Sequence, residues 1–230
     1  MTRIAMLGSG TDIGKTHISC ALLKEARERG QTVHAYKPVM SGFAPDQLGE
    51  SDAGRLAAAC GHNIDAASLD RFCHYAFTEA VAPNVAARRS GISMDYTALV
   101  DRARRAMAGD KVLFLLEGAG GVLSPVTDEK LNADLAADLG LSAVIVTANY
   151  LGTISHTLSA IESCRQRGVA VCAIAISQPT VDFGLPAEVI EEIGRWTHLP
   201  CIAFDHDSDD QIPSGAGPLL AAIEGRMVET

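Results

Sequence analysis

A glycine-rich segment near the start of the chain constrains the fold more than any other feature. Gly8-Ser9-Gly10-Thr11-Asp12-Ile13-Gly14-Lys15-Thr16 follows an apolar run at residues 3–7 and opens a helical pattern at 15–29. Glycines let backbone N–H groups turn inward around phosphate oxygens, and the N-terminus of the helix adds its dipole. Lys15 would neutralise phosphate charge, and the Thr16 hydroxyl would coordinate Mg²⁺. The segment predicts a strand, a phosphate-binding loop and a helix, although five residues instead of four separate the first glycine from Gly-Lys-Thr.

Short apolar runs alternate with helical patterns along the chain. Strands are expected at residues 3–7, 112–116, 143–146, 169–176 and 201–204, with a weaker one at 32–36, and helices at 15–29, 51–59, 94–108, 131–139, 153–167 and 186–196. Continuous apolar runs are typical of parallel strands that are covered on both faces. The pattern predicts an α/β fold of the P-loop NTPase type, a mostly parallel sheet with helices on both faces. No linker or repeat divides residues 1–230, so we expect a single domain.

Composition excludes several classes of protein. The chain has 19 Lys and Arg against 28 Asp and Glu, a net charge of −9, so a general grip on nucleic acid is not expected. Its six cysteines form no C-x-x-C pair, which predicts free thiols in a reducing cytoplasm. The N-terminus lacks the features of a signal peptide. Residues 139–161 carry no Asp, Glu, Lys or Arg, but Gly, Asn, Ser and His interrupt them, so no membrane span is expected.

Charged residues follow several of the predicted strands, where an open parallel sheet binds its ligands. Glu117 closes the run 112–116, and a carboxylate at the end of a buried strand is costly unless it is paired or bound to a metal. Asp52 opens the helix 51–59 and Lys37 follows the strand 32–36. Each also has an ordinary interpretation: an acid exposed at the sheet edge, an acid favoured in the first turn of a helix, and a solvated loop lysine.

Taken in order, these motifs resemble those of the dethiobiotin synthetase family. They are Gly8…Gly14-Lys15-Thr16, Lys37-Pro38-Val39 with Ser41-Gly42, Ser51-Asp52-Ala53, Glu117-Gly118-Ala119-Gly120-Gly121 and Leu151-Gly152-Thr153-Ile154-Ser155-His156-Thr157. The family has the same five-residue spacing in its phosphate loop, and the resemblance runs from about residue 3 to about residue 180. It implies a homodimer that uses ATP and Mg²⁺ to carboxylate 7,8-diaminononanoate and close a ureido ring. One amine would trap CO₂ as a carbamate, ATP would phosphorylate that carbamate, and the second amine would expel phosphate.

The resemblance also implies roles for individual residues. Lys37 would be the main catalytic residue, Lys15 would hold phosphate and carbamate charge, and Thr16, Asp52 and Glu117 would bind Mg²⁺. The expected nucleotide-binding residues are Asp12, Ile13, Gly14, Lys15, Thr16, His17, Asp52, Glu117, Gly118, Ala119, Gly120, Ser177 and Gln178. The expected substrate-binding residues are Thr11, Lys37, Ser41 and Glu117 and, from the opposite subunit, Leu151, Gly152, Thr153, Ile154 and Ser155.

The chain departs from the family pattern mainly at the end that would bind the base. The Gly-Thr-Asp-Thr of the family is Gly8-Ser9-Gly10-Thr11 here, and the Asn common at position 155 is Ser155. Where the family has an adenine-reading Asn the chain has Ser177, followed by Gln178-Pro179, and Cys201-Ile202-Ala203-Phe204 replaces a Gly-x-Ile-Pro segment. Because a serine offers one short hydroxyl, we expect weak selectivity among nucleoside triphosphates.

Other classes of protein fit parts of the sequence. A partitioning or metal-delivery ATPase would carry a lysine where this chain has Gly10, and a cobyric-acid-type amidotransferase would need a second domain. A non-catalytic nucleotide-binding or sensing domain remains open. The acidic run at residues 205–210 does not fit an EF-hand, because position 210 is Asp instead of Gly and position 216 is Ala instead of Glu. We expect His156 to be structural and the arginines at 102–105 to lie on an exposed helix face.

Overall fold

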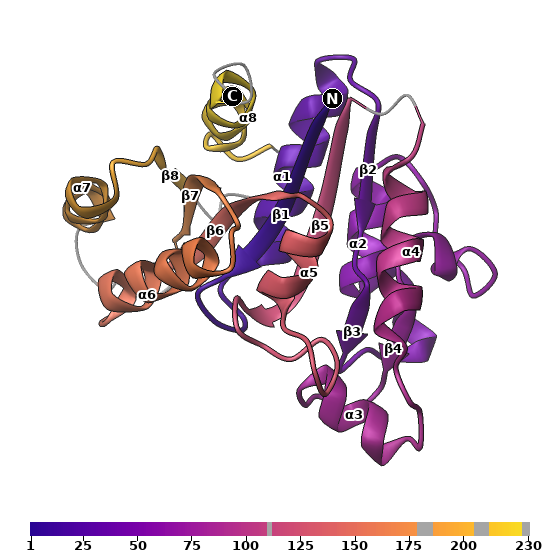
Figure 1. Cartoon of the computed structure of the whole chain (residues 1–230). Helices are drawn as coiled ribbons and strands as arrows, with labels where there is room; N and C mark the ends of the chain where they lie inside the picture. The colour runs from indigo at the N-terminus through magenta and orange to yellow at the C-terminus, as the bar shows by residue number, and fades with distance from the viewer. Residues whose placement is uncertain (110–111, 179–185, 205–211, 227–230) are drawn as a thin grey trace.

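A computed structural model describes residues 1–109, 112–178, 186–204 and 212–226 of the chain (Figure 1). The strands are β1 (Thr2–Gly8), β2 (Val33–Tyr36), β3 (Val39–Ser41), β4 (Tyr75–Phe77), β5 (Leu113–Gly121), β6 (Ser142–Ala148), β7 (Val171–Ser177) and β8 (Cys201–Phe204). The α-helices are α1 (Lys15–Glu28), α2 (Asp52–Ala59), α3 (Pro83–Arg89), α4 (Tyr96–Met107), α5 (Asn132–Asp138), α6 (Thr153–Gln166), α7 (Pro186–Thr197) and α8 (Ala216–Arg226). Two 3₁₀ segments, η1 (Pro45–Glu50) and η2 (Leu69–Arg71), complete the described elements.

A six-stranded parallel sheet forms the centre of the molecule. Its strand order is β2-β5-β1-β6-β7-β8, so the sheet runs from β2 at the right of Figure 1 to β8 at the left. Each of these strands coincides with a predicted strand, including β2, which matches the weaker candidate at 32–36, and the prediction of an α/β fold of P-loop NTPase type is confirmed. The register pairs Met6 of β1 with Glu117 of β5, so the acidic residue lies inside a strand and not after it.

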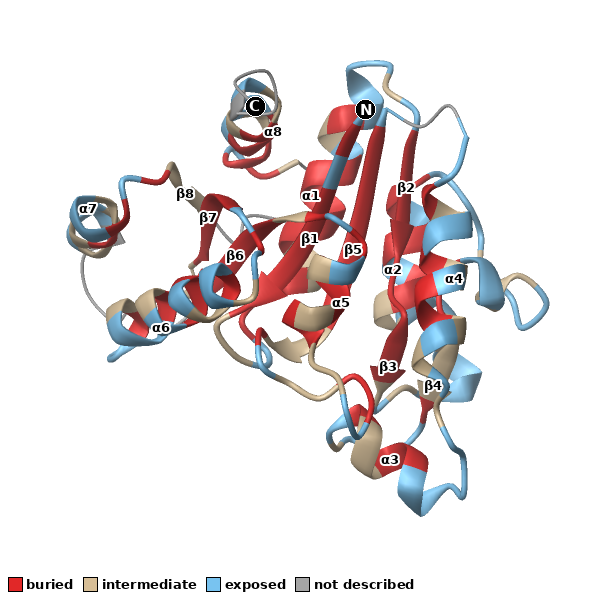
Figure 2. Ribbon diagram, viewed as in Figure 1, coloured by how far each residue is buried: buried red, intermediate tan, exposed pale blue. Residues whose placement is uncertain are grey.

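Helices bury both faces of the sheet, as the apolar runs predicted. Helices α1, α2 and α8 pack on one face, and α4, α5, α6 and α7 pack on the other. Figure 2 shows the central strands buried along their length, while each helix is buried on the inner side and exposed on the outer side. At 25 cal/mol per Å², a buried Leu or Ile side chain contributes about 1.5–3 kcal/mol, so the two apolar layers fix the frame that carries the loops.

Some elements were not predicted. The three-residue strands β3 and β4 form a separate parallel pair that places Ser41 beside the end of the main sheet. Helix α8 packs its Leu219, Leu220 and Ile223 side chains, all fully buried, against the face that holds α1. The predicted strand 169–176 begins at Val171 and the predicted helix 94–108 begins at Tyr96. The acidic run 205–210 lies outside the described residues.

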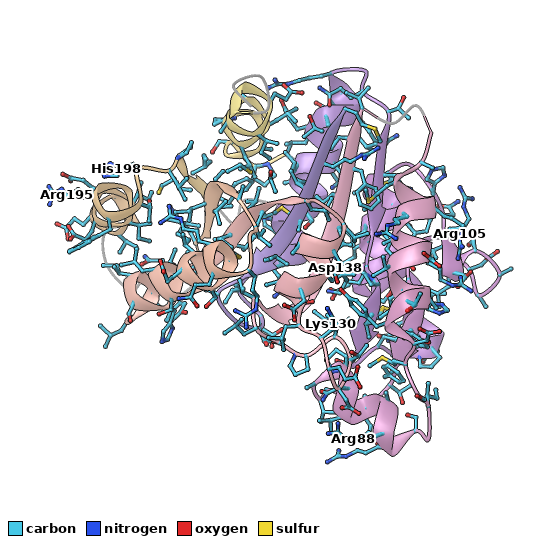
Figure 3. All side chains as sticks on the ribbon, viewed as in Figure 1. Arg88, Arg105, Lys130, Asp138, Arg195 and His198 are labelled. Atoms are coloured by element: carbon cyan, nitrogen blue, oxygen red, sulfur yellow. The ribbon has the colours of Figure 1, made fainter. Side chains whose placement is uncertain are left out.

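Ion pairs connect charged side chains at the surface of the protein. Lys130 precedes α5 and lies 3.4 Å from Asp138, the last residue of that helix; both are labelled in Figure 3. Asp138 also accepts a hydrogen bond from the Tyr96 hydroxyl of α4. The exposed face of α4 carries Arg104, 3.9 Å from Asp101. The six cysteines, all among the described residues, form no disulfides, as predicted. No helix among the described residues is long and apolar enough to cross a bilayer.

Two helical glycines give opposite expectations for stability. A Cβ at Gly54 of α2 would clash with the carbonyl oxygen of Leu48 and lie 2.5 Å from that of Gly49, whereas a Cβ at Gly194 of α7 would meet nothing within 4 Å. We therefore expect Gly54→Ala to lower the free energy of unfolding by about 1–3 kcal/mol. Gly194→Ala should raise it by about 0.5–1 kcal/mol, because alanine is the better helix former. Urea denaturation of both variants measures this, and equal stabilities would contradict the close packing of α2 on η1.

Candidate active site

The loop between β1 and α1 wraps tightly around an open end of the sheet. A Cβ at Gly8 would lie 2.6 Å from the carbonyl oxygen of Gly10, and Gly14 has a φ of 88°, a conformation that side chains rarely adopt. A Cβ at Gly14 would also lie 2.6 Å from the Ser177 hydroxyl oxygen. The amide of Ser9 donates to the carbonyl oxygen of Val146 in β6 at 2.8 Å, which anchors the loop to the sheet. The N-terminus of α1 therefore faces the cavity beside the loop, the geometry that binds phosphate.

Three oxygen-bearing side chains from three elements meet beneath this loop. The Thr16 hydroxyl oxygen of α1 lies 2.8 Å from Asp52 Oδ1 of α2 and 2.8 Å from Glu117 Oε1 of β5. Glu117 is fully buried, so the interpretation of an acid exposed at the sheet edge is wrong. Its Oε2 atom is buried and has no hydrogen-bond partner within the described structure. Asp52 does occupy the first turn of α2, and it also belongs to this cluster.

Lys37 lies between the two carboxylates. Its ammonium nitrogen is 2.5 Å from Asp52 Oδ2 and 2.8 Å from Glu117 Oε1, and only 3% of the residue is exposed. The backbone amide of Lys37 donates to the Phe72 carbonyl oxygen at 2.7 Å, which fixes the chain where β2 ends. Burial disfavours the charged form of Lys37, but the negative charges of Glu117 and Asp52 have the larger combined effect. They raise the pKa of Lys37 above its ordinary value. The same pairing lowers the pKa of the Asp52 carboxyl, against the effect of its burial. Lys37 is therefore a fixed cation and not a solvated loop lysine.

Lys15 is the second buried lysine of the site. Its ammonium group donates to the Gly10 carbonyl oxygen at 3.0 Å, within the loop itself. Burial and the nearby charge of Lys37 lower the pKa of Lys15 to about 8, although Glu117 and Asp52 partly offset them. The negative charge of a bound phosphate would offset both effects, so Lys15 is suited to bind an anion.

A cavity of about 620 Å³ opens over these groups. Most of the residues predicted for the nucleotide and the substrate line it: Thr11, Asp12, Ile13, Gly14, Lys15, Thr16, His17, Lys37, Ser41, Asp52, Ala119, Gly120 and Ser177. Sequence reasoning missed three further lining residues, Met40, Arg55 and Ala148. Glu117 lies under the floor of the cavity, and neither Gly118 nor Gln178 is among its lining residues. Gln178 instead donates its backbone amide to Phe204 of β8.

The turn that ends β5 is held by a residue that the sequence did not single out. Asn132, at the start of α5, is buried and donates its side-chain amide to the carbonyl oxygens of Ala119 and Gly121 at 2.7 and 2.8 Å. A Cβ at Gly118 would lie 3.1 Å from the Asn132 side chain, so the strand has little room there. Asn132 therefore positions the Glu117–Gly120 segment from behind. The sequence signal that could have indicated it is an Asn at the start of the predicted helix 131–139.

The predicted segment 151–155 lies away from this cavity. It borders a second cavity of about 670 Å³, lined also by Val189 and Trp196 of α7. Leu151 is 96% exposed, but Thr153 is buried, and its hydroxyl shares a hydrogen bond of 2.8 Å with that of Thr147. Thr153 nevertheless belongs to the lining of this cavity, and its assignment to the substrate stays a prediction. His156 bonds the Tyr150 hydroxyl at 2.8 Å, which is consistent with a structural role.

The oxygen cluster suits Mg²⁺. The described residues hold no group of three or more His, Cys, Asp and Glu that could bind a metal. Mg²⁺, however, is commonly held by one or two carboxylates together with waters and substrate phosphates. Thr16, Asp52 and Glu117 supply two carboxylates and a hydroxyl, and Glu117 Oε2 is a buried acceptor that still needs a partner. The donor set thus fits a hard cation bound together with a phosphate.

Known proteins are similar to this chain over most of its length. A family model described as an AAA domain matches residues 2–211. The ATP-dependent dethiobiotin synthetase of Caulobacter vibrioides is 45% identical over 179 residues, which are 77% of this chain and 80% of the relative. That of an Anaeromyxobacter species is 40% identical over 201 residues, 85% of this chain and 87% of the relative. The chain belongs to the dethiobiotin synthetase family.

Two solved structures are also similar to this chain at the level of the fold. The hydrogenase maturation factor HypB of Archaeoglobus fulgidus has a TM-score of 0.59 at 12% identity, covering 99% of this chain and 90% of that one. The MinC:MinD cell division complex of Aquifex aeolicus matches with a TM-score of 0.58 at 8% identity, covering 100% and 97%. Identities this low show a shared fold alone. A glycine still stands at position 10, where a partitioning ATPase would carry a lysine.

The low pKa of Lys15 has a consequence for stability. Because about 8 lies below the ordinary value of 10.5, the buried ammonium group destabilises the folded protein at pH 7, by about 3 kcal/mol. That cost disappears between pH 8 and 10.5, as Lys15 loses its proton first in the folded and then in the unfolded chain. Lys15→Met should therefore raise the free energy of unfolding at pH 7 and raise it much less at pH 10.

Urea denaturation without nucleotide at the two pH values measures the effect. Lys24→Met, at an exposed position two turns further along α1, is the matched control and should change the free energy of unfolding little at either pH. A Lys15→Met variant that is less stable than the wild type at pH 7 would show that the ammonium group is not destabilised by its surroundings.

Proposed function

We propose that this chain synthesises dethiobiotin from 7,8-diaminononanoate, CO₂ and ATP, releasing ADP and phosphate. Membership of the dethiobiotin synthetase family supports the overall reaction. The observation that carries the proposal for these residues is the position of Lys37 Nζ, 2.5 Å from Asp52 and 2.8 Å from Glu117, at the floor of a cavity that begins at the phosphate loop. A fixed cation beside a phosphate site is what a transfer between two anions requires.

The proposed reaction has three steps. One amine of the substrate attacks CO₂, forms a C–N bond and loses a proton, which leaves a carbamate anion. A carbamate oxygen then attacks the γ-phosphorus of ATP, so that an O–P bond forms as the bond to ADP breaks. The second amine attacks the carbamoyl carbon, closes the ring, loses a proton and expels phosphate. The second step brings two negative groups together, the carbamate and the phosphates of ATP, so lowering their repulsion is the main task of the protein.

The two lysines divide this task. Lys15 would contact the β- and γ-phosphates from within the loop, where its ammonium group already bonds the Gly10 carbonyl. Lys37 would stabilise the carbamate and the transferring phosphoryl group from the floor of the cavity. The backbone amides at the start of α1 would hold phosphate oxygens, together with the helix dipole. Thr11 and Ser41 line the same cavity and would contact the substrate.

Mg²⁺ would be held by Thr16, Asp52 and Glu117, and it would supply positive charge to the phosphates. Family membership and the buried, unpaired Glu117 Oε2 support this assignment. The residues of the chain that orient this set are Asn132, behind the β5 turn, and Lys37, which contacts both carboxylates.

We also infer a homodimer in which residues 151–155 serve the opposite subunit. The exposed Leu151 and Trp196 beside an apolar cavity support an interface there. The first-turn amides of α6 at residues 154 and 155 belong to the groups that a helix leaves without an intrahelical partner. Such amides would bind the carboxylate tail of the substrate without a basic residue. A single-domain, cytoplasmic enzyme that binds neither nucleic acid nor membranes is the matching expectation for the whole chain.

A non-catalytic nucleotide-binding or sensing domain is the alternative. The observation in its favour is Ser177, which lines the cavity where the family has an adenine-reading Asn. The presence of Lys15, Lys37, Asp52 and Glu117 in one cluster favours an enzyme. Nucleotide binding without production of dethiobiotin and phosphate would decide for the alternative.

The role of Lys37 can be tested directly. Lys37→Ala should lower kcat for dethiobiotin formation by about 100-fold or more, the scale of losing a donor that stabilises transition-state charge. Nucleotide affinity should fall less, because Lys15 and the loop amides remain. Product formation from the diamine, bicarbonate and MgATP gives kcat, and calorimetry gives the affinity.

Two controls accompany this measurement. Removing Lys37 takes the cation away from the buried Glu117 and the partly exposed Asp52, so thermal unfolding must show that the variant is folded at the assay temperature. Lys130→Ala, which removes a remote surface lysine, should keep the wild-type rate. Wild-type turnover in Lys37→Ala would exclude the proposed role.

The shared site can be tested by mixing two inactive proteins. Ser155→Glu places a negative charge at an exposed position in the first turn of α6, where it suits the helix dipole but repels a carboxylate tail. After subunit exchange with Lys37→Ala, one site of each mixed dimer has an intact Lys37 and an intact partner segment. Activity should return to about a quarter of the wild-type value, from the statistics of random pairing in a two-fold dimer. No recovery after proven exchange, or an active monomer in sedimentation, would contradict the shared site.

A further inference from the structure

Arg55 of α2 lines the cavity above the phosphate loop, although no sequence pattern pointed to it. It follows Asp52 by three residues, so the two side chains project from the same face of the helix. Side chains on a helix lean toward its N-terminus, which directs Arg55 back toward Asp52 and the cavity. The residue itself is exposed, so its guanidinium group is accessible to a ligand in the cavity.

The packing of α2 on α1 defines which side of the cavity Arg55 occupies. Thr16 and Asp52, in the first turns of the two helices, lie 2.8 Å apart. Cys20 lies one turn further along α1 than Thr16. Burial raises the pKa of its thiol, and the positive charge of Arg55 acts in the opposite direction. Arg55 therefore lies about one helical turn beyond Asp52 along α2, at the side of the cavity where α2 packs on α1.

The basic residues around the cavity differ in whether they have a partner within the protein. Lys37 pairs with Asp52 and Glu117, and Lys15 donates to the Gly10 carbonyl. Arg55 takes part in none of the ion pairs found within the described residues. The cavity is bordered by three basic residues, Lys15, Lys37 and Arg55. Their positive charge equals the negative charge of three acidic residues, Asp12, Asp52 and the underlying Glu117. Without Arg55 a site for a polyanion would carry a net negative charge.

We propose that Arg55 is a binding residue for the phosphates of the nucleotide, which it contacts from the α2 side. The inference rests on the proposed use of a nucleoside triphosphate at this cavity. A guanidinium group offers a planar fork of donors that matches two phosphate oxygens, which a lysine at the same place would not. Because phosphates are common to all nucleotides, Arg55 contributes affinity that does not depend on the base. That contribution matters where Ser177 offers only one short hydroxyl to the base.

Direct binding of nucleotides tests the inference. Without the diamine, MgATP, MgCTP, MgGTP and MgUTP can each be titrated into the protein by calorimetry. Arg55→Ala should weaken all four by the same factor, about fivefold to tenfold, a modest loss because the group is exposed. Arg55→Lys, which keeps the charge but loses the fork, should lose about twofold to threefold. The loss in Arg55→Ala should shrink in high salt, since exposed charges are screened.

Lys24→Ala is the matched control. It removes the same charge from an exposed position of α1 near the same cysteine, but Lys24 is not among the residues that line the cavity. Its nucleotide affinity should equal that of the wild type. Alanine is a good helix former, so α2 should keep its structure in Arg55→Ala, and circular dichroism checks this.

Three results would overturn the inference. They are an unchanged affinity in Arg55→Ala, a loss confined to one base, and an equal loss in Lys24→Ala. If Arg55→Ala instead raised KM for the diamine while nucleotide binding stayed constant, the residue would belong to the other substrate and the inference would be wrong. A wild-type protein that bound none of the four nucleotides would refute the proposed function itself, which is a separate outcome.

Discussion

The buried ion pair of Lys37 and Glu117 is the constraint on which the site depends. Both residues are almost completely removed from water, and taking two charges out of water costs several kcal/mol per ion unless the geometry is good. The sheet provides that geometry, since β2 pairs with β5 and carries Lys37 to the strand in which Glu117 lies. The Phe72 carbonyl fixes the backbone of Lys37, and Asp52 and Thr16 complete the contacts from two helices. A protein that buries charge in this way keeps its reacting groups in one place before any ligand arrives.

Much of this arrangement could be predicted because it depends on continuous apolar runs and on the residues that follow them. The main strands are buried on both faces, so their sequences are apolar throughout and easy to locate. The short β3 and β4 strands are too small to give such a signal. Helix α8 contains two glycines and a proline, and tertiary packing, not helix propensity, stabilises it.

The sequence indicated the site where backbone position decides function, and it carried no signal where side-chain direction decides. Lys15, Thr16, Lys37, Asp52 and Glu117 lie together because strand ends and helix starts of a parallel sheet meet at one edge. The inward turn of the Thr153 hydroxyl toward Thr147 and the position of Arg55 depend on how one helix packs on its neighbours. No spacing rule along the chain contains that information.

The strand order also bears on how the chain acquires its shape during synthesis. Strand β1 pairs with β5 and β6, partners that begin more than 100 residues later in the chain. The amide of Ser9 cannot reach its Val146 partner until that strand has left the ribosome. Pairings this distant are slow to form and leave apolar strands exposed while they wait. Strand β1 is thus translated well before its partners and is among the last strands to be completed, and a nascent chain arrested before β6 would hold a catalytic sequence without a catalytic structure.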